Sequence, residues 1–153
     1  MDTDSDTDDF DCFVREAEPR LRRAYGGHLA PHRVGDAVGS ALEYAWTNWD
    51  RVALMEHPVG YLFRVGLSKS RSRKQARLPT PPPNEMPQVE PALIRAVQQL
   101  PRRQREVVWL VEACEWTPTE AARALGVSLS AIRTHRSRGL ERLRRQLGVK
   151  ANA

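Results

Sequence analysis

One side of a predicted helix near the C-terminus carries only arginine and hydroxyl side chains. These residues recur at helical spacing and therefore share one face: Ser130, Arg133, Thr134, Ser137 and Arg138. Guanidinium groups bind phosphates and guanine edges with paired hydrogen bonds, and hydroxyl groups add contacts to phosphates and bases. No carboxylate interrupts this face. The chemistry it predicts is nucleic-acid binding, and it offers no catalytic group.

Two short helices joined by a tight turn must position that face. Thr117 is a good N-cap, and Glu120 three residues later completes a capping box that starts the first helix. Gly126 suits the turn, and Ser128 caps a second helix that we expect to run from Leu129 to about Leu147. The pattern predicts a helix-turn-helix, although an ordinary helical hairpin with a solvated basic face fits the same spacing.

The charge of the chain is divided unevenly along its length. The 153 residues carry a formal net charge of +5, but residues 1–11 contain six aspartates, and removing them from the total leaves +11. Most of the positive charge is arginine, the side chain best suited to paired contacts with phosphate and guanine. A body this basic indicates a nucleic-acid partner, while an acidic protein or an anionic membrane surface would also fit.

The cysteines indicate a reducing compartment, and the hydropathy of the chain indicates no membrane span. Cys12 and Cys114 are isolated in the sequence, so neither a disulfide framework nor a cysteine zinc site is predicted. No apolar run reaches membrane-spanning length, and no signal peptide precedes the first predicted helix. We therefore expect a soluble protein of the cytoplasm, associated with the nucleoid and without membrane insertion.

One set of residues raises the alternative of a metal-dependent enzyme. His28, His32 and Asp36 are spaced by four, as metal ligands on one helix face would be. The glycines and the proline among them argue against a continuous helix, and no further ligand lies nearby in the sequence. A solvated loop is the better interpretation, so we predict no metal, no cofactor and no catalytic residue.

Proline content divides the chain into two helical parts. Six of the eleven prolines fall between Pro79 and Pro91, and such a segment cannot join a helix bundle. No stretch shows strand alternation, so the predicted fold is all-α. The predicted divisions are a disordered acidic tail at 1–11, a helical module at 12–77, a Pro-rich linker at 78–91, a helix-turn-helix module at 92–147 and a tail at 148–153.

The last helix of the first module changes from apolar to basic along its length. It starts at Pro58 with aromatic and aliphatic residues and continues with basic residues: Arg64, Lys69, Arg71, Arg73 and Lys74. Aromatic residues followed by a basic run suit unstacked bases and phosphates, so single-stranded DNA or RNA is a candidate ligand. A core half followed by a solvated half is the plainer alternative.

The C-terminal module resembles the fourth domain of bacterial sigma factors of the extracytoplasmic-function (ECF) group. Residues 100–108, LPRRQREVV, are similar to the Leu-Pro-x-Arg-Gln-Arg-Glu-Val opening of that domain. The stretch TPTEAARALGVSLSAIRTHRSRGLERLR follows the family's Ser/Thr-x-x-Glu-Ile-Ala-x-x-Leu-Gly-Ile-Ser pattern and its basic recognition helix. The resemblance implies that this module, residues 92–147, reads the minus-thirty-five promoter element.

The N-terminal module resembles the second sigma domain more loosely. Residues 36–46, DAVGSALEYAW, stand where the family has Asp-Leu-Val-Gln-Glu-Val-Phe-x-x-Ala-Trp, the helix that grips RNA polymerase. Gly39 and Ser40 depart from that pattern. The polymerase-binding residues that the resemblance implies are Asp36, Val38, Leu42 and Trp46. It also implies melting of the minus-ten element by residues 12–77, with the loop Asp50–His57 holding a flipped base and the basic residues after Pro58 holding the strand.

The resemblance thus predicts a transcription initiation factor that catalyses nothing itself. Its implied partners are core RNA polymerase, promoter DNA and an anti-sigma protein. A helix-turn-helix regulator that no longer binds polymerase stays open as the alternative, because Gly39 and Ser40 remove polar groups that the family presents there.

Overall fold

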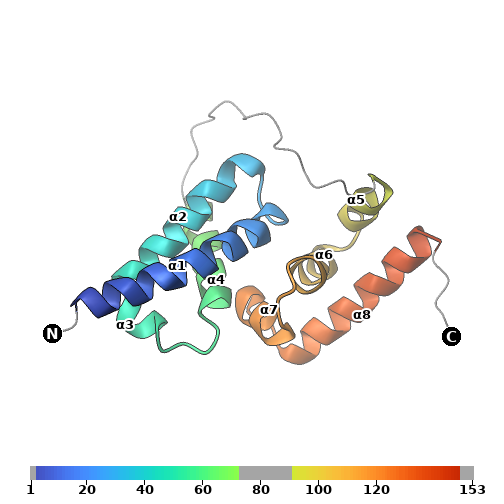
Figure 1. Ribbon diagram of the computed structural model, residues 1–153. Coiled ribbons are helices and arrows are strands. Elements are labelled where there is room, and N and C mark those ends of the chain that lie inside the picture. Colours follow the sequence, from blue (N-terminus) through green and yellow to red (C-terminus); the bar gives the residue numbers. More distant parts are fainter. Residues whose placement is uncertain (1–2, 73–90, 149–153) are drawn as a thin grey trace.

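The described parts of the chain fold as two sets of helices, each with short turns between its members (Figure 1). The computed structural model describes residues 3–72 and 91–148, and no strand occurs among them, which confirms the all-α prediction. No helix in these two ranges is both long and apolar enough to cross a bilayer. The elements are α1 (Thr3–Gly26), α2 (Pro31–Thr47), α3 (Trp49–Val52), α4 (Pro58–Ser72), α5 (Pro91–Gln98), α6 (Arg102–Val108), the π-helical turn η1 (Trp109–Ala113), α7 (Pro118–Leu125) and α8 (Leu129–Gln146).

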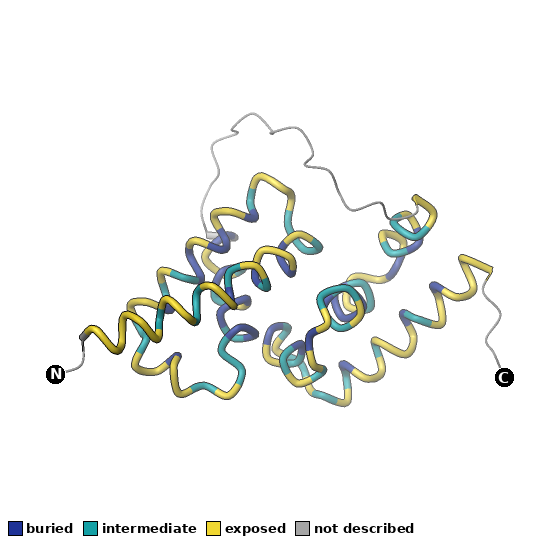
Figure 2. Tube along the Cα trace, viewed as in Figure 1, coloured by how far each residue is buried: buried dark blue, intermediate teal, exposed yellow. Residues whose placement is uncertain are grey.

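The N-terminal module is a bundle in which α1, α2 and α4 pack on one another. Their inward positions are mostly apolar and are buried, as the dark segments in Figure 2 show. Tyr25 of α1 stacks on Phe63 of α4 with 4.7 Å between ring centroids. Its hydroxyl donates to the carbonyl oxygens of Leu62 and Phe63, at 3.2 and 2.8 Å. The tyrosine therefore joins two helices through both its ring and its polar end.

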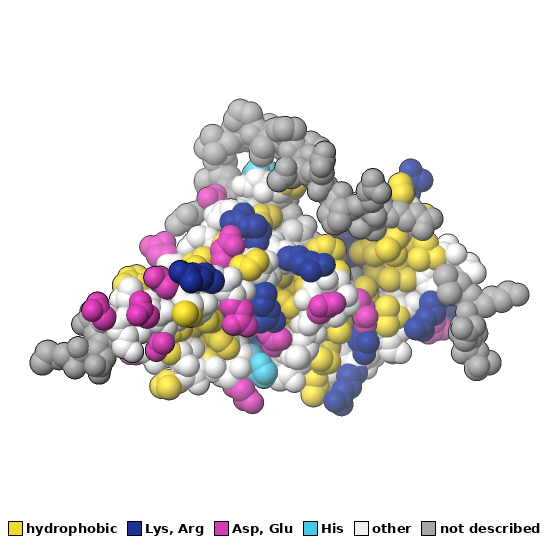
Figure 3. All heavy atoms as spheres, in the orientation of Figure 1, with side chains coloured by type: hydrophobic (Ala, Val, Ile, Leu, Met, Phe, Trp, Pro, Cys, Tyr) yellow, Lys and Arg dark blue, Asp and Glu magenta, His cyan; other side chains and the backbone are white. Residues whose placement is uncertain are grey.

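The acidic segment predicted to be a disordered tail is helical from Thr3 onward. It forms the first turns of α1, where acidic side chains gather on the surface (Figure 3). Aspartates are favourable in the first turn of a helix because the unpaired backbone N–H groups there carry partial positive charge. Phe10 then anchors the segment, since its ring lies 4.8 Å from that of Trp46 and 5.2 Å from that of Trp49. The acidic composition of the segment gives no sign of these contacts with residues distant in the sequence.

The C-terminal module builds its own small core from α5, α6 and α8. Ala96, Leu100, Val108 and Leu143 are buried together there. Helix α6 ends at Val108 and is followed directly by the π-helical turn η1, which ends at Ala113. The predicted linker, 78–91, lies outside the described residues except for Pro91, which begins α5, and the C-terminal tail lies outside them after Gly148.

One continuous core crosses between the two modules, although the proline cluster suggested modules that fold separately. Buried residues of α1, α2 and α4 form a single cluster with Leu110, Trp116 and residues of α7 and α8. Phe63 meets Trp116 edge-on at 5.5 Å, and the indole N–H of Trp109 donates to the carbonyl oxygens of Arg23 and Ala24 at 3.2 Å. We call this junction the seam.

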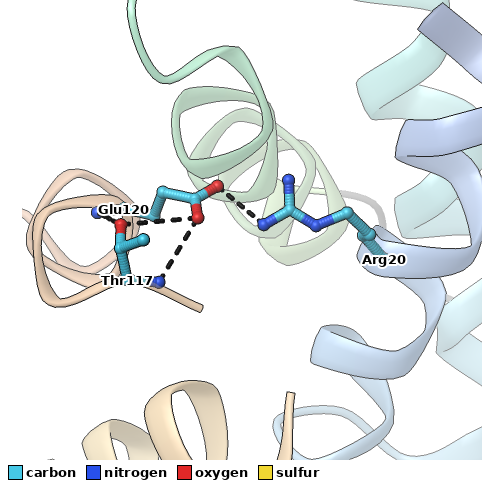
Figure 4. A network of polar contacts seen from close by, with 3 residues as sticks. All are labelled: Arg20, Thr117 and Glu120. Atoms are coloured by element: carbon cyan, nitrogen blue, oxygen red, sulfur yellow. Dashed lines mark hydrogen bonds and ion pairs between the residues drawn. The ribbon is translucent and has the colours of Figure 1, made fainter. Parts of the chain in front are cut away.

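A charged contact also crosses the seam. Arg20 of α1 pairs with Glu120 of α7 at 2.7 Å, and the same carboxylate closes the capping box of α7 (Figure 4). The first helix of the predicted helix-turn-helix is thereby attached to the N-terminal module.

Helices α4 and α7 approach each other closely at Gly60, within the seam. A Cβ at this position would lie 2.7 Å from the backbone oxygen of Glu120, whereas a Cβ at Gly39 would meet nothing within 4 Å. We expect Gly60→Ala to lower the free energy of unfolding by about 1–3 kcal/mol, because α4 and α7 must move apart. Gly39→Ala is the matched control and should raise it by about 0.5–1 kcal/mol through helix propensity. Denaturant unfolding measures both, and a stabilising Gly60→Ala would contradict the close approach.

Candidate nucleic-acid interface

The turn between α7 and α8 has the geometry that the sequence predicts. The Thr117 hydroxyl accepts from the backbone N–H of Glu120 at 3.1 Å, and the Glu120 carboxylate accepts from the backbone N–H of Thr117 at 3.3 Å. Gly126 ends α7 at φ 66°, in the left-handed region that favours glycine. The Ser128 hydroxyl accepts from the N–H of Ala131 and starts α8. The predicted capping box, turn and second cap are confirmed.

The inner face of α8 holds it against α6 and α7. Ile132 is fully buried, and Leu143 is nearly so. A Cβ on Gly139 would lie 2.8 Å from Cγ2 of Val108, so the glycine allows α8 to lie close to α6. This packing fixes the rotation of α8 about its own axis, and with it the direction in which the opposite face points.

The opposite face of α8 is exposed to solvent. All five predicted residues are exposed: Ser130, Arg133, Thr134, Ser137 and Arg138. Neither Arg133 nor Arg138 forms an ion pair within residues 3–72 and 91–148, whereas Arg136 and Arg145 on the same helix are paired with Glu112 and Glu141. Unpaired guanidinium groups on an exposed helix face suit contacts in a major groove. We call this set the recognition face.

The structure describes only part of the predicted strand-binding set on α4. Arg64 and Lys69 are exposed, and the ammonium of Lys69 lies 5.5 Å from the centre of the Tyr44 ring. Arg71 lies within α4, but its side chain is outside the description, as are Arg73 and Lys74 entirely. The loop predicted over Asp50–His57 is shorter than expected, because α3 continues to Val52.

A small hollow beside Lys69 contains two tyrosines that sequence reasoning missed. The hollow has a volume of about 350 Å³ and is lined by Tyr44, Tyr61 and Arg64 among others. The two tyrosine hydroxyls are 3.1 Å apart, and this hydrogen bond raises the pKa of Tyr61, with burial as the second cause. Tyr61 could have been noticed from its place ahead of the basic run, but only the fold brings Tyr44 to it.

The predicted polymerase-binding residues on α2 divide between its two faces. Asp36 is exposed, and Trp46 keeps 54% of its surface exposed beside Phe10. Leu42 is half-buried, and Val38, at 3% exposure, packs in the core, so Val38 offers no surface to a partner. Glu43, which the sequence reasoning left out, lies at helical spacing from Asp36 and Trp46 and is exposed with them.

Comparisons with known proteins give one family match for the C-terminal module and two solved structures with a similar fold. Residues 91–143 match the family described as Sigma-70, region 4. The C-terminal module is thus similar in sequence to sigma-70 region 4. The sigma factor RpoE of Bartonella quintana, solved with the anti-sigma factor NepR, has a similar fold, with a TM-score of 0.69 and 21% sequence identity. The superposition covers 94% of this chain and 99% of RpoE. CnrH, solved with the cytosolic domain of CnrY, gives a TM-score of 0.63 at 23% identity, over 93% of this chain and 89% of its own.

The predicted resemblance to a sigma factor is therefore confirmed. The match to region 4 covers the helix-turn-helix, and the shared fold extends over nearly the whole chain. No curated protein matches the chain in the sequence comparison.

The rival metal site finds no support in this sigma-factor fold. The His28 ring lies edge-on to Phe63 at 5.0 Å, and its Nδ1 is 3.1 Å from the carbonyl oxygen of Ala24. Burial lowers the pKa of His28, which favours the neutral ring. His32 and Asp36 are exposed on α2. Over the described ranges, no group of three or more His, Cys, Asp or Glu side chains is placed to hold a metal ion.

Proposed function

We propose that this protein is an ECF sigma factor, which binds core RNA polymerase and directs it to promoters. The single observation that carries the proposal is the match to region 4 together with an exposed recognition face whose two arginines form no ion pair among the described residues. In this proposal Arg133 and Arg138 contact base edges of the minus-thirty-five element, while Ser130, Thr134 and Ser137 contact phosphates and bases beside them. The protein catalyses no reaction itself, since its binding free energy selects the DNA that the polymerase transcribes.

The N-terminal module opens the minus-ten element in this proposal. The exposed face of α2, with Asp36, Glu43 and Trp46, contacts the polymerase, and Leu42 lies at its edge. Arg64 and Lys69, together with Arg71, Arg73 and Lys74 beyond the described side chains, hold the phosphates of the separated strand. Residues 50–57 are proposed to hold the flipped base, and the hollow between Tyr44 and Tyr61 adds aromatic surface next to Lys69.

The closed arrangement must open for this function. The positions that give the minus-thirty-five and minus-ten elements their names differ by about 25 base pairs, or ~85 Å at about 3.4 Å per pair. A compact chain of this length has a radius of gyration of about 15 Å, so it cannot reach both elements at once. The residues between α4 and α5 could span at most about 60 Å when fully extended. Together with the modules themselves, that reach is sufficient once the seam has separated.

An anti-sigma protein is the proposed regulator. RpoE was solved with the anti-sigma factor NepR, and CnrH was solved with the cytosolic domain of CnrY. We propose the same class of partner here, and the cytoplasm around the nucleoid as the place of action.

Run-off transcription with core polymerase tests the proposal. We expect a transcript from a promoter selected with the protein, and co-purification with core enzyme. Tight binding to duplex DNA without polymerase association and without a transcript would contradict the proposal and favour the helix-turn-helix regulator.

Trp46 should be the strongest single contact to the polymerase. We expect Trp46→Ala to weaken binding to core enzyme by about 2 kcal/mol, roughly 30-fold, because aromatic anchors dominate interfaces. Asp36→Ala should have a smaller effect in the same direction. His32→Ala, exposed on the first turn of α2, is the control. Duplex DNA binding by the full chain should stay unchanged in all three variants, and an unaffected Trp46→Ala would place the contact elsewhere.

A further inference from the structure

A cavity of about 810 Å³ lies at the seam between the two modules. Its wall is formed by the turn after α1, the start of α2, the middle of α4, the start of α6 and the end of α7. Five of the lining residues are arginines, drawn from both modules: Arg33, Arg64, Arg102, Arg103 and Arg105. A volume of this size is in the range of small-molecule sites, about 300–1,000 Å³.

Within residues 3–72 and 91–148, acidic side chains neutralise only part of the positive charge of this cavity. Glu106 is the only acidic residue among the described residues of its lining, and Arg102 and Arg103 already bind that carboxylate at 2.9 and 3.1 Å. Arg33, Arg64 and Arg105 form no ion pair within residues 3–72 and 91–148. Three guanidinium groups with no counter-ion therefore meet around one hollow.

Arg33 is held in place and has lost part of its hydration. Its Nη2 donates to the carbonyl oxygen of Ser70 at 3.1 Å and to the Ser70 hydroxyl at 3.0 Å. Its Nε is buried and has no hydrogen-bond partner in the described structure. Burying a cation without a hydrogen-bond partner costs free energy unless an anion lies nearby. The guanidinium group is the side-chain cation whose geometry best matches phosphate oxygens.

We propose that this cavity binds a small anion with a chain of phosphate groups, such as a nucleoside polyphosphate or inorganic polyphosphate. A single phosphate would fill little of the volume and meet few of the arginines. Leu29, Leu67 and Leu125 supply an apolar part of the wall, against which a nucleobase packs. Because the arginines come from both modules, the ligand stabilises the closed arrangement.

A regulatory consequence rests on the proposed function. If promoter binding requires the seam to open, the ligand opposes promoter binding by favouring the closed state. The binding site itself does not depend on that function, so the experiment measures binding first and needs neither polymerase nor promoter.

The test uses the full chain with inorganic tripolyphosphate and, separately, adenosine triphosphate, at low ionic strength without divalent cations. Calorimetry should give saturable binding, and thermal unfolding should shift to higher temperature as the ligand is added. Arg33→Gln and Arg105→Ala should each weaken binding about tenfold or more, since hydrogen bonds between charged groups contribute about 1.5–3 kcal/mol. Arg15→Ala, an exposed arginine on α1, is the charge-matched control and should bind as the wild type does.

The comparison of ligands and of variants decides the outcome. Tighter binding of the nucleotide means that the leucine wall takes the base, and equal binding means that the phosphate chain alone is recognised; both support the site. Binding that survives both cavity substitutions but is lost in Arg133→Ala would place the phosphates on the recognition face and overturn the proposal. Absence of saturable binding in the wild type would overturn it as well.

Discussion

Arg133→Ala and Arg138→Ala are each expected to cost about 1–3 kcal/mol of binding free energy on a cognate duplex, a loss of about 5- to 150-fold. Both guanidinium groups are exposed and unpaired on the recognition face, so the substitutions remove contacts to DNA without breaking an ion pair within the described chain. Neither side chain contributes to the buried side of α8. The variants should therefore keep the unfolding free energy of the wild type to within about 0.5 kcal/mol.

The measurement requires two DNA duplexes and one control protein. A duplex selected from a random pool by the full chain serves as the cognate site, and a scrambled duplex reports binding to phosphates alone. Direct readout predicts a larger loss on the cognate duplex than on the scrambled one. Arg15→Ala removes the same charge far from the recognition face and should show at most a small loss, alike on both duplexes. Equal losses on the two duplexes for Arg133→Ala would mean that Arg133 contacts only the backbone.

Phe63→Ala should lower the free energy of unfolding by about 3–5 kcal/mol, a large part of the total stability of a domain this size. The ring is fully buried and contacts Tyr25 of α1, His28 of the following turn and Trp116 of the C-terminal module. Removing it leaves a cavity at the point where the two modules share their core. Both modules should lose stability together, because the same side chain supports each of them.

Hydrogen exchange distinguishes a shared core from two tethered units. In Phe63→Ala, amides of α7 should lose protection along with those of α2 and α4. Leu54→Ala is the control, since that leucine is 87% exposed and should change stability by less than about 0.5 kcal/mol. If protection in α7 stayed at its wild-type level while α2 and α4 became exchangeable, the modules would fold independently, as the proline cluster suggested.

Local features of this protein were determined by the sequence itself. The capping box at Thr117, the left-handed Gly126 and the cap at Ser128 depend on groups only a few residues apart, so residue type and order specify them. The recognition face is equally local, because helical spacing puts its members on one side once the opposite side is apolar. The all-α fold and the family resemblance followed from such local patterns.

Tertiary structure alone decided how these pieces meet. Val38 and Glu43 both belong to α2, yet only the packing of α1 and α4 settles that the first is buried and the second exposed. Phe10, at the end of the acidic segment, packs its ring against that of Trp46, a residue far along the chain. Arg33 and Arg105 line one cavity because the packing at the seam directs the start of α2 and the start of α6 toward the same hollow. Contacts between residues distant in sequence depend on the shape complementarity of assembled helices, which no local pattern encodes.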